Sequence, residues 1–88
     1  MRFEWDEAKR QATLKSRNLD FADAVLFDWE LALYRDDFTQ TEERIQAIGY
    51  LRDAVVVIVY TMRGNTCRII SMRKAEPSER RQYERSGF

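Results

Sequence analysis

The sequence predicts an α+β fold in which two N-terminal helices and a short C-terminal helix pack on an antiparallel sheet of three to five strands. Two observations support this prediction. Short β-branched runs separated by turn residues fill the middle of the chain, and segments with helical spacing lie on either side of them. The chain has 88 residues, so a single domain spanning residues 1–88 with one modest core is expected.

The first thirty residues predict a short strand followed by two helices. Residues 2–5 alternate polar and apolar side chains, as in a strand with one buried face. Asp6 is a suitable N-cap for the first helix, and Asn18 is a suitable end because Asn tolerates the left-handed conformation. Asp20 can cap a second, amphipathic helix that lies on the sheet. The apolar residues of this helix at helical spacing are Phe21, Ala24, Val25 and Trp29.

The central part of the chain predicts strands joined by short turns. Residues 31–35 form one strand, and residues 43–51 form another with a bulge near Gly49, where the apolar alternation slips by one. Residues 52–53 make a hairpin turn. They lead into residues 54–61, a β-branched run expected to be buried on both faces.

The last strand and the last helix meet at a junction rich in cations. A tight turn at residues 63–65 precedes a strand over residues 66–75, and Pro77 suits the first position of a helix. Side chains alternate along a regular strand, so Arg68 and Arg73 are expected to point to opposite faces. The two arginines can then cooperate only near an edge or a bend.

Composition excludes several kinds of site. The chain has no histidine and one cysteine, Cys67, so the commonest general base, the commonest metal ligand and an internal disulfide are all absent. No metal and no cofactor are therefore predicted. The longest apolar run, residues 54–62, is far shorter than the roughly 18 residues that cross a bilayer, and the N-terminus does not resemble a signal peptide. A cytoplasmic protein is expected.

Charge is balanced overall but segregated along the chain. Residues 1–18 carry five Lys/Arg against three Asp/Glu, residues 19–53 carry three against nine, and residues 54–88 carry seven against three. The net charges are therefore +2, −6 and +4. Because the basic block coincides with the last strand and helix, it predicts an anion site at their junction.

The residues at this junction suit RNA chemistry. Arginine offers paired donors to phosphate, and the Tyr83 ring offers a surface on which a base can stack. RNA cleavage by its own 2′-hydroxyl needs only alignment, proton transfer and stabilisation of phosphorane charge, and Glu79, a lysine or the Tyr83 hydroxyl could move protons. The alternative is structural: Glu79 with Tyr83, and Arg80 with Glu84, have the spacing of ordinary helix pairs.

Short motifs along nearly the whole chain form a recognisable pattern. They are Trp5-Asp6-Glu7 with Lys9, Phe21, Glu43-Arg44 with Gly49, Val57 to Thr61, Arg68-Ile69-Ile70-Ser71, Arg73-Lys74-Ala75, and Glu79-Arg80-Arg81 with Tyr83-Glu84. The pattern resembles the BrnT toxins of type II toxin-antitoxin modules. The resemblance implies a RelE-like fold, inhibition of translation by RNA cleavage, and neutralisation by a ribbon-helix-helix antitoxin called BrnA.

Candidate residues follow from the charge pattern and the resemblance together. The predicted catalytic residues are Arg68, Arg73, Glu79, Arg80 and Tyr83, and the predicted RNA-binding residues are Lys9, Lys74 and Arg81. The chain departs from many family members near its first helix: Thr13, Arg17 and Asn18 occupy the region where an Asn and then a His-Gly pair are usual. A proton-shuttling role for that His would therefore be missing.

Two functional classes remain open on the sequence. One is a metal-independent endoribonuclease toxin acting on free or ribosome-associated RNA, and the other is a noncatalytic module whose basic face binds a partner protein. For the toxin, the antitoxin is expected to cover the same face in a hetero-oligomer built on a dimer. Arg73 and Arg80 have no evident acidic partner, so their replacement by Ala is expected to spare stability and abolish toxicity.

Overall fold

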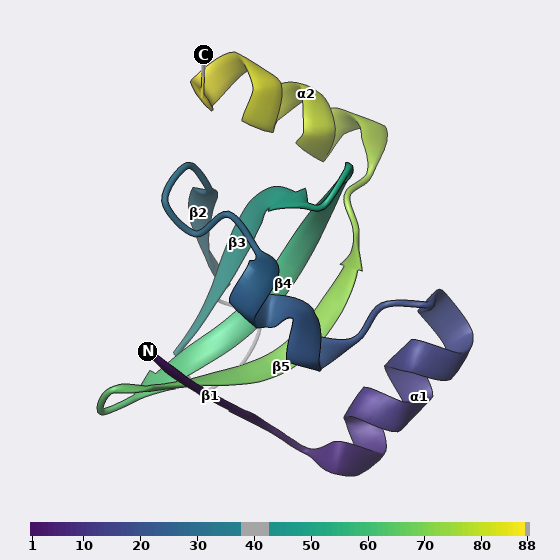
Figure 1. Ribbon diagram of the computed structural model, residues 1–88. Helices are drawn as coiled ribbons and strands as arrows, with labels where there is room; N and C mark the ends of the chain where they lie inside the picture. Colours follow the sequence, from purple (N-terminus) through teal and green to yellow (C-terminus); the bar gives the residue numbers. More distant parts are fainter. Residues whose placement is uncertain (38–42, 88) are drawn as a thin grey trace.

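A five-stranded sheet with flanking helices forms the protein, and the computed structural model describes residues 1–37 and 43–87 (Figure 1). The predicted α+β class, with five strands and a C-terminal helix, is confirmed. The strand order is β1-β5-β4-β3-β2. In chain order the elements are β1 (Arg2–Trp5), α1 (Glu7–Arg17), the 3-10 helix η1 (Phe21–Leu26), β2 (Leu33–Asp37), β3 (Arg44–Leu51), β4 (Ala54–Arg63), β5 (Thr66–Lys74) and α2 (Pro77–Gly87).

The sheet is mixed, so the prediction of a wholly antiparallel sheet is wrong. β1 pairs in parallel with β5, with Phe3 opposite Cys67 and Trp5 opposite Ile69, whereas the other three strand pairs are antiparallel. Antiparallel neighbours can be joined by tight turns, but parallel neighbours need a long crossover. All the elements between β1 and β5 provide that crossover.

The second predicted N-terminal helix is a six-residue 3-10 helix, η1. Asp20 caps it as predicted, because its carboxylate accepts a hydrogen bond of 2.9 Å from the Ala22 N–H. The buried side chains that follow are Phe21, Ala24 and Phe27, which recur every third residue. Residues three apart are eclipsed in a 3-10 helix, so this spacing buries one row of side chains, whereas an α-helix would turn them out of line.

Gly49 lies in a regular stretch of β3, so the bulge predicted there is wrong. The pairing of β3 with β4 runs without a shift through Gly49 and Val56. A Cβ atom at Gly49 would lie 2.9 Å from the Phe27 ring and 3.3 Å from the Asp28 carbonyl oxygen. Glycine is therefore needed here for the close approach of the segment after η1.

A β-bulge does occur, at Ile70 in β5. Val59 pairs with Ser71 and Tyr60 pairs with Ile69, which leaves Ile70 as the extra residue. Beyond the bulge, each side chain points to the face opposite to the one that it would have in a regular strand. Arg68 and Arg73 consequently lie on the same face of the sheet, contrary to the sequence prediction, while Cys67, Ile69 and Met72 are buried on the other face.

Helical elements cover both faces of the sheet. η1 covers the first face, where Phe21, Ala24 and Phe27 join the larger hydrophobic cluster. α2 covers part of the second face through Tyr83, which packs with Ile48, Val55 and Val57. The rest of the second face, toward Arg68, is left open by α2.

α1 lies beside the end of β1 (Figure 1). It begins at Asp6, whose carboxylate accepts a hydrogen bond of 3.2 Å from the Lys9 N–H, and it ends at Asn18 with a φ of 57°, both as predicted. The Arg17 guanidinium donates a hydrogen bond of 2.9 Å to the Met72 carbonyl, which ties the helix to β5. Within the described residues, no helix is long and apolar enough to cross a membrane.

Candidate functional site

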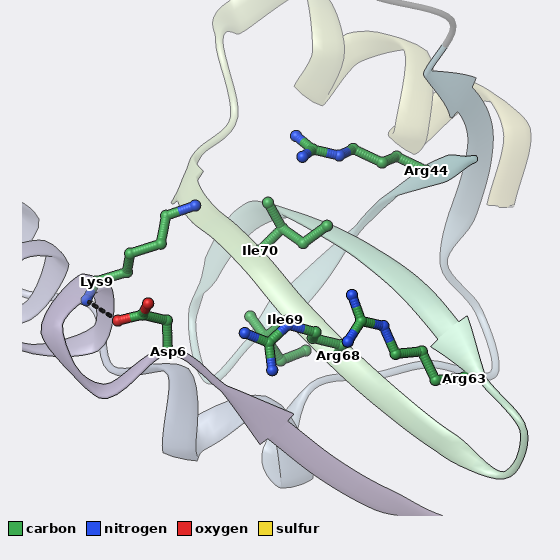
Figure 2. Close-up of a pocket in the computed structure, with 7 residues that line it drawn as sticks. All are labelled: Asp6, Lys9, Arg44, Arg63, Arg68, Ile69 and Ile70. Atoms are coloured by element: carbon green, nitrogen blue, oxygen red, sulfur yellow. Dashed lines mark hydrogen bonds between the residues drawn. The ribbon is translucent and has the colours of Figure 1, made fainter. Parts of the chain in front are cut away.

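Among the described residues, four cationic side chains line one small pocket on the second face of the sheet (Figure 2). Lys9 comes from α1, Arg44 from β3, Arg63 from β4 and Arg68 from β5. We call this the cation pocket; its volume is about 110 Å³. Figure 2 shows the four side chains arranged around Ile70. The other described residues that line the pocket are Asp6, Ile69 and Ile70.

Strand register explains why these cations meet. Thr61 in β4 pairs with Arg68 in β5, and Ile45 in β3 pairs with Tyr60 in β4. Arg44, one residue before Ile45, is therefore level with Thr61, so Arg44 and Arg68 belong to the same row across the sheet. Because of the bulge, the apolar side chain of Ile70 lies among these cationic side chains.

Cationic groups outnumber carboxylates in the described lining of the cation pocket. Arg68 pairs with Glu4 at 3.3 Å, and its side chain is 28% exposed. The Arg44 Nε is buried and has no hydrogen-bond partner among the described residues. The one carboxylate in the described lining is that of Asp6, which also caps α1. The cationic lining suits an anion, because Lys and Arg side chains form strong charge-assisted hydrogen bonds with anionic oxygens.

Arg73 takes part in a different cluster, which we call the ion-pair triad. Its guanidinium forms two hydrogen bonds, of 2.7 and 2.9 Å, with the two carboxylate oxygens of Glu79. Arg35 donates a further one of 2.7 Å to Glu79. The expectation that Arg73 lacks an acidic partner is therefore wrong. The Glu79 side chain, 11% exposed, is the link by which α2 is held to β2 and β5.

Glu79 is a carboxylate kept ionised by its surroundings. The hydrogen bonds from Arg73, the Glu76 N–H and Arg35 lower its pKa to about 2 despite its burial. The same pairing raises the pKa of Arg73. A carboxyl group with so low a pKa is a weak base and holds no proton at neutral pH, which disfavours the predicted proton-transfer role of Glu79.

Tyr83 is buried in the smaller hydrophobic cluster, with 1% of its surface exposed. Its ring packs edge to face against Tyr50, with ring centroids 5.6 Å apart, and burial raises the pKa of its hydroxyl. A covered ring cannot stack on a nucleobase, so the expectation of stacking at Tyr83 is wrong. The contacts of Tyr83 instead hold α2 against the sheet.

The remaining predicted site residues lie outside both clusters. Arg80 is half exposed and stands 3.9 Å from Glu84, which matches the structural alternative of an ordinary helix pair. Lys74 and Arg81 are also exposed. None of these three is among the described residues that line the cation pocket, whereas Lys9 and Arg68 are.

Arg44 and Arg63 were not predicted as site residues. The strand pairing that the two tight turns impose could have identified them from the sequence. A two-residue turn at Arg52 and Asp53 places residue 44 opposite residue 61, and the next two-residue turn places Arg63 close to the start of β5. Counting outward from the two turns therefore brings Arg44, Arg63 and Arg68 to one end of the sheet.

Acid is expected to destabilise the protein through Glu79. The folded-state pKa of about 2 lies below the ordinary value of 4.5, so the ionised form stabilises the fold above pH 4.5. This contribution, about 2 to 3 kcal/mol, is lost as the pH falls from 4.5 toward 2. Urea unfolding measured between pH 7 and pH 2 tests this. A Glu79→Gln variant, lacking the titrating group, should lose less stability over this range; an equal loss would contradict the assignment.

No set of three or more His, Cys, Asp or Glu residues within 1–37 and 43–87 is arranged to hold a metal ion. Positive charge in the cation pocket comes from Lys and Arg side chains, which can contact phosphate oxygens directly. The described site thus has the donors for an anionic ligand.

Comparison with known proteins identifies the family. Residues 5–79 match the family model described as the ribonuclease toxin BrnT of type II toxin-antitoxin systems. The crystal structure of the Brucella abortus ribonuclease toxin BrnT is similar, with 31% sequence identity and a TM-score of 0.69, over 86% of this chain and 97% of that one. Curated protein sequences gave no match. The chain therefore belongs to the BrnT family of ribonuclease toxins of type II toxin-antitoxin systems.

Proposed function

We propose that this protein inhibits translation by cleaving RNA at the cation pocket, in the cytoplasm and without a metal ion. The observation that carries the proposal is the gathering of Lys9, Arg44, Arg63 and Arg68 on the part of the second face that α2 leaves open. In the reaction, a 2′-oxygen attacks the adjacent phosphorus. The O2′–P bond forms and the P–O5′ bond breaks, which leaves a 2′,3′-cyclic phosphate and a 5′-hydroxyl.

The residues of the pocket suit the charge changes of this reaction. Negative charge builds on the nonbridging oxygens, where Arg63 and Arg68 can donate hydrogen bonds in place of a metal ion. Among the described residues, two titratable groups besides arginine line the pocket, Asp6 and Lys9. We assign them the proton transfers: one accepts the 2′-hydroxyl proton, and the other protonates the departing 5′-oxygen.

The other predicted site residues receive supporting roles. The ion-pair triad and Tyr83 keep α2 in place beside the cation pocket. Exposed cations on α2 and at the end of β5 can contact flanking phosphates, which adds affinity that depends on salt. These outer cations are Lys74, Arg80 and Arg81.

The family is defined by a toxin-antitoxin system, so a cognate antitoxin is the expected partner. We propose that it is a ribbon-helix-helix protein of the BrnA type, and that it covers the cation pocket in a hetero-oligomer built on a dimer. The proposal extends to a RelE-like classification of the fold and to RNA that is free or bound to ribosomes.

Cleavage of a labelled single-stranded RNA by the purified protein in excess EDTA tests the proposal. We expect cleavage to persist in EDTA, because arginine side chains supply the cationic donors, and the upstream products should end in 2′,3′-cyclic phosphate. A matched RNA with 2′-deoxyribose at the cut site should stay intact. Cleavage that requires added Mg²⁺ would contradict metal independence. Tight binding without cleavage would favour the noncatalytic module.

A further inference from the structure

We propose that the cation pocket is a binding site for one phosphate group and that it recognises this group without a nucleobase. The proposal rests on the proposed function only where it concerns RNA, because the site itself is defined by its size and its donors. It predicts that inorganic phosphate alone binds in the pocket. It also predicts that RNA is read there through its backbone.

Size is the first reason. Pockets that hold drug-sized ligands have volumes of about 300 to 1,000 Å³, well above the volume of about 110 Å³ found here. This space corresponds to roughly four water molecules at about 30 Å³ each. A tetrahedral phosphate group is on this scale, whereas a nucleoside with its base and ribose is too large to enter.

The donors are the second reason. The side chains of Lys9, Arg44, Arg63 and Arg68 bring N–H groups from four different elements to the same space. Phosphate oxygens accept several such bonds at once, and arginine matches their geometry in pairs. An anion here would therefore be surrounded by cationic donors from α1, β3, β4 and β5.

The lack of base-reading groups in the described lining is the third reason. Reading a base edge needs a specific set of donors and acceptors, such as those of Asn, Gln, Asp or Glu. The described lining holds one such residue, Asp6, to which the proposed reaction assigns a proton transfer. The rest of the lining is cationic or aliphatic, with Ile69 and Ile70. At this subsite, cleavage should consequently depend little on which base is attached.

Titration of the purified protein with inorganic phosphate tests the proposal directly. In ¹⁵N spectra of the arginine side chains, the Arg44 Nε–H signal should shift to saturation, and the Arg52 Nε–H signal should not. Arg52 is the matched control because it forms its ion pair with Asp23 of η1. Chloride at equal ionic strength should not reproduce the shift. An Arg44 signal that stays in place, or that chloride moves equally, would overturn the proposal.

Phosphate binding by substituted proteins provides a second test. Arg44→Gln should weaken phosphate binding about ten- to a hundredfold, as expected for the loss of one charge-assisted contact, and Arg52→Gln should leave it unchanged. Lys9→Gln, at an exposed position of α1, gives a second variant if Arg44→Gln fails to fold. Phosphate affinity that is the same in the pocket variants and the native protein would also overturn the proposal.

RNA cleavage measured in the same samples separates the two proposals. Phosphate binding without any RNA cleavage would refute the proposed function and leave the phosphate site standing. RNA cleavage that phosphate does not inhibit, with an unmoved Arg44 signal, would refute the phosphate site and leave the ribonuclease standing. If both proposals are correct, phosphate should inhibit cleavage over the same concentration range in which it shifts the Arg44 signal.

Discussion

Arg73→Ala is expected to lower the free energy of unfolding by about 2 to 3 kcal/mol. The substitution leaves the Glu79 carboxylate, 11% exposed, without the two hydrogen bonds from Arg73. Breaking a buried ion pair from one side commonly costs about 3 to 5 kcal/mol, and the remaining contact with Arg35 reduces this cost. In a domain of this size the melting temperature should fall by roughly 10 to 20 °C.

Arg80→Ala is the matched control, because Arg80 lies just beyond Glu79 on α2 and is also an arginine. Its side chain is 54% exposed and stands 3.9 Å from Glu84, so its removal should change stability by less than about 0.5 kcal/mol. Thermal and urea unfolding of the two variants make the comparison. Equal stability of both variants would mean that the ion-pair triad does not hold α2.

Arg68→Ala is expected to slow RNA cleavage by about 100- to 1,000-fold, the usual cost of losing one donor to the developing charge. Arg68 lines the cation pocket, and its side chain is 28% exposed, so solvent and substrate can reach it. Its pair with Glu4 is partly exposed, and losing it should cost no more than about 1 kcal/mol of stability. Single-turnover cleavage at saturating protein measures the chemical step.

Two further variants interpret the result at Arg68. Arg68→Lys should recover only part of the rate, because an ammonium lacks the planar pair of donors. Arg52→Ala removes a partly exposed arginine ion pair at η1 and should leave the rate unchanged. A normal rate in Arg68→Ala, with the protein folded, would move the reaction away from the cation pocket.

Local chemistry made part of the fold predictable from the sequence. The caps at Asp6 and Asn18 and the turn at residues 52–53 depend on a few neighbouring residues, and all three were predicted correctly. η1, the bulge at Ile70 and the parallel pairing of β1 depend on packing between distant segments, and all three were missed. Short-range patterns do not contain that information.

The candidate site was predicted only in part, because strand pairing brings some of its residues together from distant segments. Arg68 was selected from the charge pattern and Lys9 from the resemblance to the BrnT toxins, and both line the cation pocket. Arg44 was missed because its neighbours in the sequence are acidic or apolar, and it joins the site only through strand pairing. The partner of Arg73 was missed because Glu79 lies beyond the turn that precedes α2.

The extra residue in β5 makes the spacing of this strand as important as its composition. If β5 had its present length but paired regularly with β4, the five-residue spacing would place one of the two arginines on the η1 side. Deletion of the extra residue would leave a spacing of four, and a regular strand would then keep both arginines on the same face. When relatives are aligned, a one-residue gap at the position of Ile70 is therefore compatible with the same pair of arginines on one face of the sheet.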